Sequence, residues 1–240
     1  MPFKRTAGVA GVLFVVLVLA AFLLTTDAPD PDAPSDVIAR YYVGDAGPAK
    51  AASTLSALAL VPFAVFIAGL LTAVRPAERE QGEGWSVVGV IGTGVTAAAV
   101  LVSSGVNAAM AIGAETLRTA PALTGALYRL NTLMLLGMVA LGFALTAGGF
   151  SVAGTRTRAL PPSLCSLGII AALFGVLGGI LSVESVQGSA LGSIGFIAFL
   201  MFLAWSLLLA MSMTRRHSLA MGDQPAVPAD DAALALTHQT

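Results

Sequence analysis

The stretch WSVVGVIGTGVTAAAVLVSSGVNAAM, residues 85–110, decides the fold, because it contains no charged side chain. A helix of about 20 apolar residues crosses a hydrocarbon core of about 30 Å, so this stretch is long enough to span a membrane. The whole chain of 240 residues is 57% hydrophobic and only 10% charged. Soluble domains carry about 25% charged residues. We therefore predict an all-α protein, a polytopic six-helix transmembrane bundle.

Five further apolar runs accompany this stretch, and together they predict one membrane domain over residues 1–213. Lys4 and Arg5 precede the first run, a pattern also typical of a signal peptide. That run exceeds the roughly 7–15 apolar residues of a signal peptide, so we favour an uncleaved span. Pro62, near the middle of the second run, is expected to bend its helix. We place the spans at about residues 7–24, 52–74, 85–110, 127–149, 163–184 and 190–213.

Polar segments separate and follow the predicted spans. Residues 26–50 form an outer loop rich in Asp and Pro, a composition that keeps a segment solvated. Within it, the helical spacing of Val37, Ile38, Tyr41 and Tyr42 predicts a short interfacial helix with its tyrosines at headgroup depth. RPAEREQGEG, residues 75–84, is expected to be a short polar loop, and residues 214–240 a disordered cytoplasmic tail.

The distribution of basic residues predicts the orientation of the chain. Six spans place both termini on one side, and Lys and Arg are enriched in cytoplasmic loops. Eight basic residues fall on the side of the termini and four on the other. The N-terminus and the C-terminus are therefore predicted to be cytoplasmic. The eight are Lys4, Arg5, Arg75, Arg79, Arg156, Arg158, Arg215 and Arg216, and the four are Arg40, Lys50, Arg118 and Arg129.

Small residues spaced along the spans predict how the helices pack. Lipid tails are as apolar as leucine, so helices in a membrane associate through close backbone approach at small side chains. Four such stripes are present, and packing explains them without a ligand. They are Ala64, Ala68 and Thr72; Gly89, Gly92 and Thr96; Ala140, Ala144 and Gly148; and Ala171, Gly175 and Gly179.

Polar residues within the spans gather toward the predicted outer leaflet, where they form the candidate functional cluster. Arg129 and Asn131, two residues apart on one helix, differ in direction by about 200° and cannot both face the bundle. We expect the shallower Arg129 to reach the headgroups. The deeper Asn131 should point inward, toward Asn107 or Ser103. The cluster comprises Asn107, Arg129, Asn131, Glu184 and Gln187.

Glu184 has two interpretations. An ionisable group at membrane depth is a functional hypothesis by default, here a proton-titrating or cation-binding carboxylate. The alternative, which we favour, is a carboxylate at a helix end that already touches water and pairs with Arg129 or Arg118. A lone carboxylate supplies neither the second acid nor the nucleophile of common hydrolytic mechanisms.

Other chemistry finds little support in the sequence. Cys165 is the only cysteine, and both histidines, His217 and His238, lie in the polar tail. We therefore expect no metal site and no cofactor. The formal net charge of −1 and the absence of a basic stripe argue against a nucleic-acid partner.

The order of these features resembles a widespread bacterial family of six-helix integral membrane proteins of unknown function. The resemblance rests on SDVIARYY in the outer loop, on GLLTAVR at the end of the second span, and on RTRALPPSLCSLGIIAA leading into the fifth. The chain departs from the family pattern at Pro162-Ser163, where a bulky aromatic residue often follows the proline. The resemblance implies the architecture and a bacterial cytoplasmic membrane, and it adds no site residue.

These observations predict a multi-pass membrane protein that is not an enzyme and that acts through partner proteins or lipids, with a homo-oligomer among the alternatives. The competing hypothesis is a transporter or channel subunit for a small solute or protons, with an outward vestibule around Glu184. Glycine-interrupted helices favour the second hypothesis. The scarcity of polar residues below the outer third of the spans argues against it.

Overall fold

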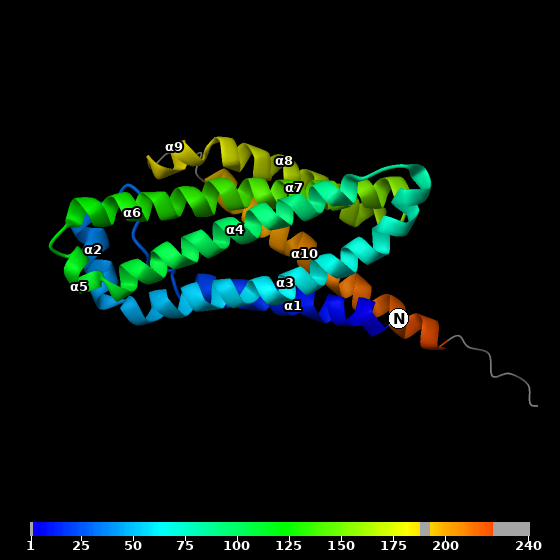
Figure 1. Ribbon diagram of the computed structural model, residues 1–240, viewed down its shortest axis with the longest axis horizontal. Coiled ribbons are helices and arrows are strands. Elements are labelled where there is room, and N and C mark those ends of the chain that lie inside the picture. Colours follow the sequence, from blue (N-terminus) through cyan, green and yellow to red (C-terminus); the bar gives the residue numbers. More distant parts are fainter. Residues whose placement is uncertain (1, 188–192, 223–240) are drawn as a thin grey trace, which may run out of the picture.

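The structure, a computed structural model, describes residues 2–187 and 193–222, and this part of the chain is a bundle of helices without strands. Six of the described helices are long and apolar enough to cross a membrane, as predicted. They lie side by side along one axis (Figure 1). The chain is therefore an all-α, six-helix transmembrane bundle.

The helices alternate between long spans and short connecting elements. Residues 121–157 form one continuous span in which a short π-helical stretch, η1, joins α6 to α7. The short helices α2, α5 and α9 lie in the connections between spans. The elements are α1 (Pro2–Leu23), α2 (Ser35–Gly44), α3 (Ala46–Gln81), α4 (Trp85–Ile112), α5 (Ala114–Leu117), α6 (Pro121–Leu133), η1 (Met134–Met138), α7 (Val139–Thr157), α8 (Pro162–Ile180), α9 (Ser182–Val186) and α10 (Ser193–Gly222).

Three predicted boundaries were wrong. The second span runs on as helix through most of the polar segment predicted as a loop. It ends only at Gln81, and the next residue, Gly82, has a φ of +70° that suits glycine. The fifth span ends at Ile180, so Glu184 belongs to the separate helix α9. The predicted tail is helical as far as Gly222, and residues 223–240 lie outside the described residues. Helix formation depends on backbone hydrogen bonds and not on hydropathy, so helices extend beyond the apolar runs.

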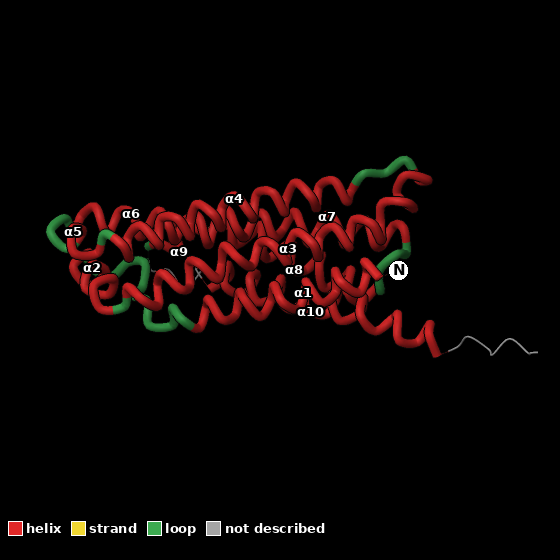
Figure 2. Tube along the Cα trace, turned by 60° about the horizontal axis from the view of Figure 1, so that its bottom comes forward, coloured by secondary structure: helices red, strands yellow, loops and turns green. Residues whose placement is uncertain are grey.

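The six spans form a closed ring in which each packs against two neighbours. The order around the ring is α1, α3, α4, α7, α8 and α10, and α10 returns to α1. At one end lie α2 and α5, and at the other lie the start of α1, the α3–α4 turn and the α7–α8 turn (Figures 1 and 2). We call these the α2 end and the N-terminal end.

Three of the four predicted small-residue stripes lie at helix contacts. Gly89, Gly92 and Thr96 of α4 are buried and pack against α7. The stripes of α7 and α8 face each other, since a Cβ on Gly175 would lie 2.8 Å from the carbonyl oxygen of Ala140. The α3 prediction was wrong, because Ala64 and Thr72 are exposed. The close contact of α3 lies instead at Gly69, which packs against Ala7 of α1.

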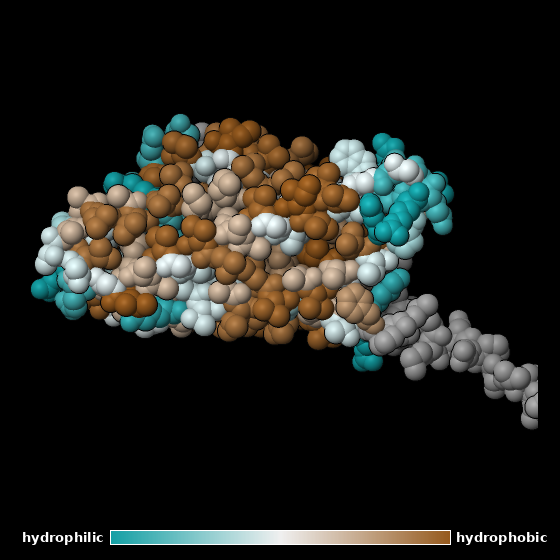
Figure 3. All heavy atoms as spheres, viewed as in Figure 1, coloured by the Kyte–Doolittle hydropathy of each residue, from teal (hydrophilic) through white to brown (hydrophobic). Residues whose placement is uncertain are grey.

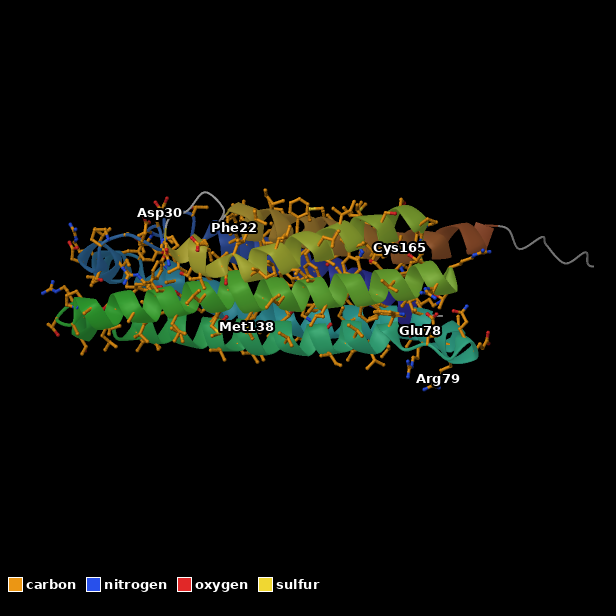
Figure 4. The ribbon with its side chains drawn as sticks, turned by 90° about the horizontal axis from the view of Figure 1, so that it is seen from above. Phe22, Asp30, Glu78, Arg79, Met138 and Cys165 are labelled. Atoms are coloured by element: carbon orange, nitrogen blue, oxygen red, sulfur yellow. The ribbon has the colours of Figure 1, made fainter. Side chains whose placement is uncertain are left out.

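The surface has the distribution of polarity expected of a membrane protein. On the face drawn in Figure 3, apolar residues cover the middle of the bundle, and hydrophilic residues gather toward both ends. Figure 4 places Phe22 and Asp30 toward the α2 end, and Glu78, Arg79 and Cys165 toward the N-terminal end. On this face the apolar region thus separates two polar ends.

Candidate functional site

The α2-end half of the bundle contains a partly open cavity of about 340 Å³, which we call the α2-end cavity. Its walls come from α1, α2, α3, α4, the α6–η1–α7 span and α10, and Thr25, Ala28 and Pro31 of the loop after α1 also line it. Most of the lining is aliphatic or aromatic. Among the described lining residues none is charged. The polar lining side chains are Thr25, Tyr41, Tyr42, Ser53, Ser56, Thr96, Ser103, Ser104, Asn107, Tyr128, Asn131 and Thr132.

One face of α4 forms a wall of this cavity. The lining residues of this helix are Thr96, Val100, Ser103, Ser104 and Asn107, whose spacing places them on a single helical face. At a rise of about 1.5 Å per residue, this face covers about 16 Å along the helix axis. The cavity therefore reaches from the α2 end toward the middle of the bundle.

Asn107, on this face of α4 toward the α2 end, connects three helices. Its Oδ1 accepts a hydrogen bond from the Tyr42 hydroxyl of α2 at 2.5 Å. Its Nδ2 donates to the Ser53 hydroxyl at 2.8 Å and to the Ala49 carbonyl oxygen at 3.2 Å, both in α3. Both donors of the amide and its acceptor are thus engaged within the protein, so Asn107 serves as a structural connection between α2, α3 and α4.

Asn131 is bonded at only one end of its amide. Its Oδ1 accepts a hydrogen bond from the Ser103 hydroxyl of α4 at 2.6 Å, which confirms the predicted partner. Its Nδ2 donates to no other described residue, and the side chain lines the cavity. At the deeper end of the cavity, the buried Thr96 Oγ1 has no hydrogen-bond partner among the described residues. The cavity wall therefore carries hydrogen-bonding capacity that the protein itself does not use.

The π-helical stretch η1 begins three residues after Asn131. Its Leu135 and Leu136 line the cavity, and its buried Gly137 lies against Ser182 of α9. Single π turns insert an extra residue into a helix and occur frequently at functional sites. Here the extra residue changes the directions of the side chains that follow Asn131 in the span. Hydropathy carries no signal for such a turn, so the sequence did not predict it.

The structure separates the predicted polar cluster into two groups. Asn107 and Asn131 line the cavity, whereas Arg129, Glu184 and Gln187 are exposed and are not among its lining residues. Exposure of Glu184 fits the favoured interpretation of a carboxylate at a helix end. No ion pair joins Glu184 to Arg118 or Arg129. The vestibule predicted around Glu184 is not where the cavity lies.

Tyrosines close the cavity at the α2 end. The predicted helix around Tyr41 and Tyr42 is present, but Tyr42 is almost fully buried within the protein, against Tyr128. The Tyr128 hydroxyl donates to the carbonyl oxygen of Pro29 at 2.5 Å and attaches the loop after α1 to α6. Burial, followed by the nearby Tyr128 and Tyr41, raises the pKa of Tyr42 well above its ordinary value of 10.0. Tyr42 therefore remains a hydrogen-bond donor at neutral pH.

A buried carboxylate at the N-terminal end was missed by the sequence analysis. Glu78 is fully buried and accepts hydrogen bonds from the backbone N–H of Ser86, at 2.9 Å, and from the Ser86 hydroxyl. Arg75 lies 3.7 Å away, an ion pair too long for a hydrogen bond. Ser86 is in the first turn of α4, where backbone N–H groups lack helical partners and favour a negative charge. Glu78 thus caps α4 and holds the α3–α4 turn together.

The described residues offer no cluster of three or more His, Cys, Asp or Glu side chains that could hold a metal ion. Comparison with protein-family models, with curated proteins and with solved structures finds no match to this chain. The family resemblance therefore stays a prediction, and any function is argued from the geometry of the cavity.

Proposed function

We propose that the chain is a non-enzymatic multi-pass membrane protein that binds an apolar or amphiphilic molecule dissolved in the bilayer. The observation that carries the proposal is the α2-end cavity, with its apolar walls and few uncharged polar groups. Ligand pockets of this composition commonly measure about 300–1,000 Å³. At about 340 Å³ the cavity has room for a small molecule or for part of a larger lipid.

The polar groups of the lining support binding better than catalysis. They are hydroxyls and amides, which orient a ligand through hydrogen bonds. Acyl transfer and hydrolysis need a nucleophile beside a general base, and the described lining residues provide no such pair. A role through lipids requires no second chain at the cavity. A second copy or another membrane protein would pack on the outward faces of the bundle.

We place the protein in the bacterial cytoplasmic membrane with the α2 end outside and both termini in the cytoplasm. The excess of basic residues in the loops at the N-terminal end supports this orientation. Cys165 is the only cysteine of the chain, so it is first replaced by serine, and single cysteines are introduced into the Cys165→Ser protein. A membrane-impermeant maleimide should then label Asp32→Cys on intact cells and should label Gln81→Cys only after lysis. The opposite pattern would reverse the orientation.

The binding proposal is tested with a small apolar photoreactive label, a trifluoromethyl-aryl diazirine, added to the purified protein in lipid nanodiscs. Labelling of peptides that line the cavity should saturate with label concentration. Val100 lines the cavity and Leu101 beside it is exposed, so they form a matched pair. Val100→Trp fills the cavity and should abolish the saturable labelling, whereas Leu101→Trp should preserve it. Labelling that never saturates, or that is equal in the two variants, would refute the proposal.

A further inference from the structure

The two asparagines of the cavity differ in how many hydrogen-bonding groups of their side-chain amides have a partner. Asn107 is fully engaged by Tyr42, Ser53 and the Ala49 carbonyl oxygen. Asn131 uses only its Oδ1, in the bond from Ser103, and its Nδ2 donates to no described residue. A buried polar group without a partner is costly, so an unused donor on a cavity wall favours a ligand with an acceptor. Asn131 is therefore one residue whose free donor can bind a carbonyl or hydroxyl oxygen.

The absence of charge on the described lining restricts the head of that ligand. Transferring a phosphate or carboxylate into this site would remove its water without providing a cation in exchange. A hydroxyl or an ester carbonyl carries a far smaller desolvation penalty, and the Asn131 amide can offset it. The site therefore selects an uncharged head.

Aromatic rings line the side of the cavity between α1 and α10. Near the N-terminal end these helices approach closely, because a Cβ on Gly11 would lie 2.7 Å from the Ala210 Cβ. Toward the α2 end they diverge (Figure 1). There Phe22 of α1 stacks on Phe196 of α10 with ring centroids 5.6 Å apart.

Phe22 and Phe196 form a wall one side chain thick. Both line the cavity, and they are 40% and 39% exposed. Figure 4 shows Phe22 at the α2 end of α1, next to the loop that carries Asp30. In a membrane the exposed side of this pair faces lipid, so a rotamer change of two phenyl rings would connect the cavity with the bilayer.

We propose that the α2-end cavity takes a neutral single-chain lipid whose ester or hydroxyl head is bound by Asn131 and whose chain passes between Phe22 and Phe196. This proposal rests on the proposed function and adds the class of ligand. The cavity is at the lower end of the size range of ligand pockets, so a long chain must extend beyond it. The acyl chain can pass between the two phenyl rings, so that its far end stays in the bilayer.

Two lipids with the same chain test the selection against charge. 1-Oleoylglycerol and 1-oleoyl-lysophosphatidic acid are compared as competitors of the saturable diazirine labelling, at matched mole fractions in the nanodisc. The neutral lipid should compete at least about tenfold more effectively. Equal competition, or stronger competition by the charged lipid, would overturn the inference while leaving the proposed function intact. Failure of the diazirine itself to saturate would instead count against the proposed function.

The role of Asn131 is tested with variants that separate ligand binding from structure. Asn131→Leu should weaken competition by 1-oleoylglycerol about tenfold. Ser103→Ala removes the same Ser103–Asn131 bond but leaves the amide in the cavity, and it should retain competition. Arg129→Leu, an exposed position on the same helix, serves as the control and should have no effect. If Ser103→Ala loses as much as Asn131→Leu, the Asn131 amide is structural and the inference is wrong.

Phe196→Ala tests whether the lipid passes between Phe22 and Phe196. It should accelerate exchange of bound 1-oleoylglycerol several-fold, because the barrier between cavity and bilayer is removed. Ile197→Ala, at the neighbouring exposed position, should leave the exchange rate unchanged. An unchanged rate in Phe196→Ala would exclude passage at this pair.

Discussion

Two glycines two residues apart on α4, which therefore point in different directions, provide a direct measure of the α4–α7 contact. Gly92 is buried against α7, and an added Cβ would lie 2.5 Å from the Thr146 backbone nitrogen and 2.8 Å from the Gly142 carbonyl oxygen. Ordinary van der Waals contact begins at 3.4 Å, so α7 would have to move by about 0.9 Å. Gly94 has nothing within 4 Å of the same added atom. We therefore compare Gly92→Ala with Gly94→Ala.

The expected difference in the free energy of unfolding follows from the contacts. Alanine favours a helix over glycine by about 1 kcal/mol, and this gain applies to both variants and cancels in the comparison. Overpacking against backbone that cannot rotate away costs about 1–3 kcal/mol. Gly94→Ala should be more stable than the parent protein. Gly92→Ala should be less stable than Gly94→Ala by about 1–3 kcal/mol.

The assay is reversible unfolding by sodium dodecyl sulfate in mixed micelles, monitored by circular dichroism, with equal initial helix content as the control for folding. The parallel variants Gly142→Ala and Gly105→Ala repeat the contrast, since a Cβ on Gly142 meets the Thr96 backbone and one on Gly105 meets nothing within 4 Å. If Gly92→Ala proved as stable as Gly94→Ala, the close contact between α4 and α7 would not exist in the membrane protein. The ring order of the bundle would then need revision.

Four further predictions use the same unfolding assay. Glu78→Ala should cost about 3–5 kcal/mol, because it leaves the buried donors of α4 without an acceptor, while the exposed Glu80→Ala should change nothing measurable. Because the pKa of Tyr42 is raised in the folded protein, its contribution to stability is complete below pH 10.0 and declines as the pH rises above that value, by at most about 1.4 kcal/mol per pH unit. Tyr42→Phe should flatten this alkaline decline in the free energy of unfolding. An equal decline in the variant and the parent protein would contradict the assignment. Asn107→Leu should destabilise the bundle by about 2–4 kcal/mol through loss of its three bonds, and a neutral result would remove its structural role. Ala64→Leu should be tolerated because the position is exposed, and a large loss of stability would restore it as a helix contact.

The fold was predictable from the sequence because the signal for a membrane span is a property of a single segment. Each apolar run is long enough by itself to form a span, whatever the other runs do. The inward direction of Asn131 was likewise predictable from local geometry, since helical periodicity separates it from Arg129 by about 200°. The bond from Ser103 follows from that direction.

The stripe of Ala64, Ala68 and Thr72 shows where such reasoning fails. Small residues are tolerated at helix contacts and also against lipid, so the stripe by itself does not identify the buried face. The buried position of Glu78 was not predicted, for a different reason. Its charged surroundings resemble a loop, and its partner Ser86 is brought to it only when α3 and α4 fold against each other.

The sequence by itself determined that the chain has six membrane-spanning segments and roughly where they lie, because crossing depends on the exchange of water for lipid along one segment. Only the tertiary structure decided which side chains meet. The separation of Asn107 and Asn131 from Glu184, the π turn after Asn131 and the α2-end cavity all depend on how distant helices pack against each other. Lipid solvates any apolar helix face almost equally well, so hydropathy does not determine which faces point inward. Contacts between helices select them.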